Sequence, residues 1–127
     1  MNNTKNTEII IQHNSPNKQG PDYSLRIDGN GNVEYNGLKN VNVSKISPED
    51  FNRILHEFQD LYFFSFKDSY ESINQSKSQQ EEQISVSLRL GDKYKTVKYT
   101  EGSRVEPGLK MLVKQIENIT NPNAIDK

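Results

Sequence analysis

YSLRIDGNGNVEYNG, at residues 23–37, is the most informative stretch of this 127-residue sequence. Apolar and polar residues alternate over Tyr23–Ile27 and again from Val33 to Tyr35, which is the two-residue period of a half-buried strand. Between them, Asp28-Gly29-Asn30-Gly31 combines residue types that accept the tight backbone of a hairpin turn. The stretch therefore predicts an antiparallel β-hairpin.

The same pattern recurs on both sides of this hairpin. Residues 84–90 alternate in the same way, Gly91-Asp92 suits a two-residue turn, and Lys93–Tyr99 returns as a second hairpin. Upstream, the β-branched run Ile9–Ile11 predicts a first strand over residues 8–13. Val41 and Val43 mark a further short extended segment.

Two segments carry helical signals. Ser47 is placed to cap a helix that begins at Pro48, with Glu49 and Asp50 at its positive end. Its apolar face recurs at helical spacing, and the helix should end near Asp60. A second helix is predicted from Pro107, with an apolar stripe formed by Leu109, Leu112, Val113, Ile116 and Ile119.

These elements predict an α+β fold with a mostly antiparallel sheet of about five strands and two helices packed on one face. Residues 8–120 form a single domain in this interpretation, and residues 1–7 and 121–127 are disordered tails. The polar, low-complexity segment 67–83 is expected to be a mobile or functional loop.

Composition restricts the possible functions. The chain carries 16 basic and 17 acidic residues, whereas nucleic-acid-binding domains usually have a basic excess. It has no cysteine, which rules out disulfides, thiolate metal sites and a cysteine nucleophile. No apolar run is long enough for a membrane span, and the polar N-terminal residues do not read as a signal peptide, so we expect a cytoplasmic protein.

Residues 9–119 resemble a family of small domains of unknown function found in bacterial and some archaeal proteins, often secreted or lipid-anchored. The resemblance rests on GPDYSL at 20–25, DGNGNVEYNG at 28–37, ISPE at 46–49 opening a helix that runs to Phe63-Phe64, and PGL at 107–109. Family members typically carry a C-F-G-x-C-P-x-Y motif, and here Pro16 and Gly20 occupy the cysteine positions. The resemblance implies the fold and no activity.

Few residues point to catalysis or metal binding. The two histidines, His13 and His56, lack the spacing of a metal motif, and no cofactor or metal is predicted. The oxygen-rich turn at 28–32 is similar to a calcium loop but lacks the other ligands of an EF-hand. A hairpin turn accounts for the same residues.

We interpret the chain as a non-catalytic binding module, a monomer or weak homodimer, whose partner the sequence does not identify, with a protein as one candidate. Strand alternation places Arg26, Arg89, Tyr94 and Lys98 together on the outward sheet face, which makes this face and the 67–83 loop the candidate surfaces. One alternative is a small hydrolase-like enzyme using carboxylates with His13. Another is binding of single-stranded nucleic acid by the outward face, which its basic and aromatic residues would suit.

Overall fold

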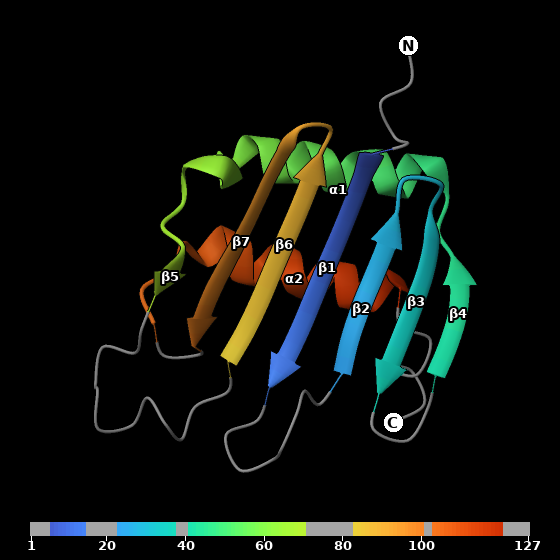
Figure 1. Cartoon of the computed structure of the whole chain (residues 1–127), viewed down its shortest axis with the longest axis horizontal. Coiled ribbons are helices and arrows are strands. Elements are labelled where there is room, and N and C mark those ends of the chain that lie inside the picture. The colour runs from blue at the N-terminus through green and yellow to red at the C-terminus, as the bar shows by residue number, and fades with distance from the viewer. Residues whose placement is uncertain (1–5, 15–22, 38–40, 71–82, 101–102, 121–127) are drawn as a thin grey trace.

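The computed structural model describes residues 6–14, 23–37, 41–70, 83–100 and 103–120. Its elements form two layers, a sheet and a pair of helices (Figure 1). Residues 1–5 and 121–127 of the predicted tails lie outside the described residues, and Thr7 is the first residue of β1.

In the described part of the chain, the sheet has seven strands in the order β4-β3-β2-β1-β6-β7-β5. The first strand of the chain lies in the middle, where it pairs antiparallel with both β2 and β6 (Figure 1). The strands are β1 (Thr7–Asn14), β2 (Tyr23–Asp28), β3 (Asn32–Gly37), β4 (Val41–Lys45), β5 (Ser69–Tyr70), β6 (Gln83–Leu90) and β7 (Lys93–Thr100).

The prediction of about five strands was wrong, and the two short edge strands account for the difference. β4 has five residues and coincides with the short extended segment marked by Val41 and Val43. β5 has only two residues, which are too few to show any periodicity. β5 also lies inside the segment 67–83 that was predicted to be a loop. It pairs in parallel with β7 at Lys98 and Tyr99, an arrangement that depends on contacts distant in sequence. Residues 71–82 of that predicted loop lie outside the described residues.

Both predicted hairpins are present, and each turn depends on one glycine with a positive φ. In the first, the Gly31 N–H donates to the Asp28 carbonyl oxygen at 2.9 Å, and Gly31 has a φ of 86°. In the second, Gly91 has a φ of 66° between the paired residues Leu90 and Lys93. L-residues with a side chain rarely adopt this conformation, which explains the glycines.

The other elements of the described residues are α1 (Pro48–Asp60), the 3₁₀ turn η2 (Phe63–Ser65) and α2 (Pro107–Thr120). The α1 boundaries confirm the predicted start and end. Ser47 has an extended backbone, and its side chain accepts a hydrogen bond from the Asp50 N–H at 3.0 Å. The predicted N-cap is therefore confirmed.

Both helices cover the same face of the sheet, as predicted (Figure 1). The core lies between the two layers. Its buried residues come from alternate positions of the strands and from the predicted apolar stripes of the helices, and include Ile9, Ile11, Leu25, Ile27, Val86, Leu88, Val97, Phe51, Ile54, Phe58, Leu109, Leu112 and Ile116. Within the described residues, no helix lies on the opposite face of the sheet.

Candidate functional site

The open face of the sheet, opposite the helices, is built by the side chains that alternate with the core residues. The strand register aligns them in rows across the sheet. One row runs through Asp28, Glu8, Arg89 and Tyr94, because each of these residues pairs with the next on the neighbouring strand. This face therefore carries charged and aromatic groups side by side.

Arg89 and Tyr94 form the most prominent contact on the open face. They pair across β6 and β7, and the Arg89 guanidinium lies over the Tyr94 ring, 4.7 Å from its centre. Tyr94 as a whole residue remains 52% exposed. An exposed cation–π contact of this kind contributes about 0.5–1 kcal/mol, so the two side chains hold each other in place.

Hydroxyl groups on the same strands fix the other end of the Tyr94 side chain. The Thr96 hydroxyl donates to the Tyr94 oxygen at 3.3 Å and lies 2.8 Å from the Ser87 hydroxyl. Hydrogen bonding by the Thr96 and Ser87 side chains lowers the pKa of Tyr94, with burial opposing this effect and Arg89 adding to it. Tyr94 is thus exposed but held in one orientation.

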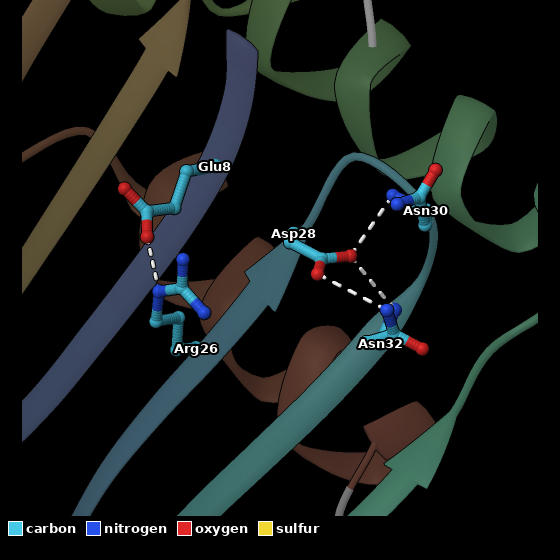
Figure 2. A network of polar contacts seen from close by, with 5 residues as sticks. All are labelled: Glu8, Arg26, Asp28, Asn30 and Asn32. Carbon is cyan, nitrogen blue, oxygen red and sulfur yellow. Dashed lines mark hydrogen bonds and ion pairs between the residues drawn. The ribbon is translucent and has the colours of Figure 1, made fainter. Parts of the chain in front are cut away.

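Arg26 lies on the same face but is engaged with acidic neighbours. Figure 2 shows its guanidinium paired with the Glu8 carboxylate on the adjacent strand. On its other side, Arg26 is directly opposite Glu34. β1 separates Arg26 from the strand of Arg89, so the two arginines do not form one cluster.

Lys98 is the fourth predicted residue and lies toward the opposite end of β7. It is four positions from Tyr94, which corresponds to about 13 Å along a strand. Lys98 borders a hollow of about 160 Å³ at the β5 edge, together with Ser69, Tyr70, Gln83, Tyr99 and Thr100. All four predicted residues are exposed on the open face, but only Arg89 and Tyr94 are in contact.

The turn with a calcium-loop composition is closed by its own hydrogen bonds (Figure 2). The Asp28 carboxylate accepts from the Asn30 N–H at 2.9 Å and from the Asn32 N–H and side-chain amide, both at 3.1 Å. Burial raises the pKa of Asp28, but these hydrogen bonds from Asn32 and Asn30, together with Arg26, lower it overall. The carboxylate therefore stabilises the turn.

The two histidines lie on different layers of the domain. His56 is exposed on α1. His13 faces the helix side, where its ring stacks on Tyr23 with the centres 5.3 Å apart and the planes 15° apart. Within the described ranges, no group of three or more His, Cys, Asp or Glu side chains could hold a metal ion.

His13 also borders a cavity of about 180 Å³ under α2, which we call the α2 cavity. Its lining residues are His13, Ile84, Tyr99, Lys110, Met111, Val113, Lys114 and Glu117. Burial raises the pKa of Glu117, and the nearby His13 partly opposes this rise. Glu117 is the one carboxylate among these lining residues, whereas the hydrolase alternative requires carboxylates acting together with His13.

The sequence interpretation missed this cavity because it considered only the apolar stripe of α2. The sequence nevertheless contained a signal for the charged residues that border this cavity. Lys110, Lys114 and Glu117 are spaced four and three residues apart, which places them on one side of a helix. His13 has the same parity in β1 as the buried Ile9 and Ile11, so it points to the helix layer.

In the part of the chain that the structure describes, neither helix is long and apolar enough to cross a membrane. No curated protein matches the sequence. The sequence profile of the family "Domain of unknown function (DUF6438)" matches residues 7–120. This match confirms the expected similarity to a family of small domains of unknown function. Because it covers most of the 127 residues, the chain belongs to the DUF6438 family.

Proposed function

We propose that this domain is a non-catalytic recognition module that binds a partner protein on its open sheet face. The observation that carries the proposal is the Arg89–Tyr94 pair, exposed on a face that neither helix covers. Arginine and tyrosine are among the residues that most often dominate the binding energy of protein interfaces.

The geometry of the pair suits recognition. Its cation–π contact and the Thr96 hydroxyl restrict Tyr94 before any partner arrives. A side chain that is already ordered loses less conformational entropy on binding, and this raises affinity. The rest of the described face offers small polar groups, such as Ser85 and Gln12, that can form hydrogen bonds at the rim of an interface.

The charge on the open face favours a protein over a nucleic acid. On the described strands, the basic side chains of this face are Arg26, Lys45, Arg89 and Lys98, and the acidic ones are Glu8, Asp28 and Glu34. Binding to a phosphate backbone is driven by a clear excess of basic groups. A surface of mixed charge instead complements another protein of mixed charge.

The test compares two variants that each lose one arginine and one tyrosine. Arg89→Ser with Tyr94→Ser removes the pair, whereas Arg53→Ser with Tyr62→Ser removes exposed side chains from the helix side. Each purified protein is immobilised, captured partners are identified by mass spectrometry, and the strongest partner is titrated by calorimetry. We expect the open-face variant to lose at least about 2 kcal/mol of binding free energy.

Thermal unfolding of both variants is the control for folding, because exposed substitutions usually change stability by no more than about 0.5 kcal/mol. Equal capture by the open-face variant and the wild-type protein would contradict the proposal. Arg26→Ser and Lys98→Ser, made singly, should weaken binding less, since Arg26 is paired with Glu8 and Lys98 is distant from Tyr94.

A further inference from the structure

The α2 cavity combines an apolar floor with a charged rim. Ile84 and Tyr99, which pair across β6 and β7, contribute buried side chains from the sheet, and Val113 contributes one from α2. The rim carries Lys110, Lys114, Glu117 and His13. Such an apolar pocket with a few polar groups is the usual form of a small-molecule site.

The charges on the rim favour an anionic ligand. The lining includes two lysines, Lys110 and Lys114, and a single glutamate, Glu117. The Lys110 ammonium donates a hydrogen bond to the Ser103 carbonyl oxygen at 3.4 Å, while Lys114 is exposed to solvent. Burial raises the pKa of Glu117, and the nearby His13 partly opposes this rise.

The size of the cavity limits the apolar part of the ligand. A volume of about 180 Å³ is similar to that of engineered apolar cavities of about 150 Å³, which bind benzene. A single ring or a branched chain of similar size therefore fills it. The lining residues Ile84, Val113 and Tyr99 provide the apolar contacts for such a group.

We propose that the α2 cavity binds a small organic carboxylate whose apolar body lies on Ile84, Tyr99 and Val113 and whose anionic group is held by Lys114 and Lys110. This site lies on the helix side of the sheet and does not depend on the function proposed for the open face.

Benzoate is the probe, with benzamide as its uncharged isostere and benzylamine as its cationic counterpart. Each is titrated into the isotopically labelled protein, and the methyl signals of Ile84 and Val113 are followed by NMR. We expect benzoate to shift both signals with a Kd of about 1 mM, an ordinary affinity for a ligand of this size. Benzamide and benzylamine should bind more weakly.

Two substitutions should change the affinity for benzoate in opposite directions. Lys114→Gln removes a favourable charge and should weaken binding by about 1.5- to 5-fold, the range expected for a solvent-exposed ion pair. Glu117→Gln removes an unfavourable charge and should strengthen binding by about two- to threefold. The matched control is Lys45→Gln, which removes a lysine from the far face and should leave the affinity unchanged.

Each substitution has its own expected change in benzoate affinity, so the proposal stays testable even if one of the two variants fails to fold. Benzamide binding as tightly as benzoate, or weaker binding of benzoate after Glu117→Gln, would overturn the assignment of an anion site. Tighter binding of benzylamine would assign the cavity to a cation instead and would also overturn it. Unshifted Ile84 and Val113 signals at saturating benzoate would exclude the cavity as the site.

Discussion

The backbone N–H of Ile46 donates a hydrogen bond of 2.9 Å to the carbonyl oxygen of Gly31. This bond joins the turn of the first hairpin to the residue that precedes the N-cap of α1. Ile46 is itself buried in the core. The contact therefore links the direction in which α1 leaves the sheet to the conformation of a turn fifteen residues earlier in the chain.

Substitution of Gly31 should be more damaging than substitution of the other turn glycine. A Cβ at Gly31 would lie 2.7 Å from the Ile46 carbonyl oxygen, at a φ of +86°. Gly91 has a similar φ of +66°, but a Cβ there meets nothing within 4 Å. We expect Gly91→Ala to lower the free energy of unfolding by about 1–2 kcal/mol and Gly31→Ala by about 2–4 kcal/mol. Urea unfolding measures both, and equal losses would contradict the steric argument.

Removal of the α1 cap should destabilise the domain. Ser47→Ala deletes the oxygen that accepts from the Asp50 N–H, at an expected cost of about 0.5–2 kcal/mol. Ser65→Ala removes an exposed hydroxyl elsewhere and should change stability by no more than about 0.5 kcal/mol. If the denaturation midpoints of the two variants coincide, the cap does not contribute to stability.

Asp28 should make the stability of the domain depend on acidic pH. Its folded pKa is lowered from 3.8, so its stabilising contribution is complete above pH 3.8 and is lost as the pH falls through the lower folded pKa. Asp28→Asn should therefore be less stable than the wild type at pH 7. The difference should shrink as the pH falls below 3.8.

The measurement for Asp28 is the urea midpoint at a series of pH values. Glu34→Gln is the control, since it removes a carboxylate from the adjacent strand while the turn hydrogen bonds remain. A difference between Asp28→Asn and wild type that stays constant with pH would show that ionisation of Asp28 does not stabilise the turn.

Tyr62 should tolerate glycine better than its neighbour Leu61 does. Tyr62 has a left-handed backbone, with φ 57° and ψ 50°, and its side chain is 76% exposed. Left-handed residues with a side chain cost about 1–2 kcal/mol, so Tyr62→Gly should raise stability by up to about 1 kcal/mol after the entropy cost of glycine. Leu61 has a φ of −82° and packs against the core, so Leu61→Gly should lower stability. Thermal unfolding should separate the two variants, and a destabilised Tyr62→Gly would refute the expectation.

Local signals in the sequence were sufficient for the hairpins, the α1 cap and the apolar stripes of both helices. Each of these features depends on residues only a few positions apart, such as Ser47 and Asp50 or Leu90 and Lys93. Alternation also placed Arg26, Arg89, Tyr94 and Lys98 on the open face. It could not show that Arg89 touches Tyr94 while Arg26 pairs with Glu8, because side chains select partners among all their neighbours in space.

The sequence by itself thus determined both helices, the longer strands, their faces and the two hairpins, since period and turn chemistry are local properties. Only the tertiary structure decided that β1 lies between these hairpins, pairing with β2 on one side and β6 on the other. It also decided that β5 joins the edge of β7 and that His13 and Glu117 border the same cavity. These contacts join segments separated by many residues, so they form only when the whole core is buried and leave no periodic signal in either segment.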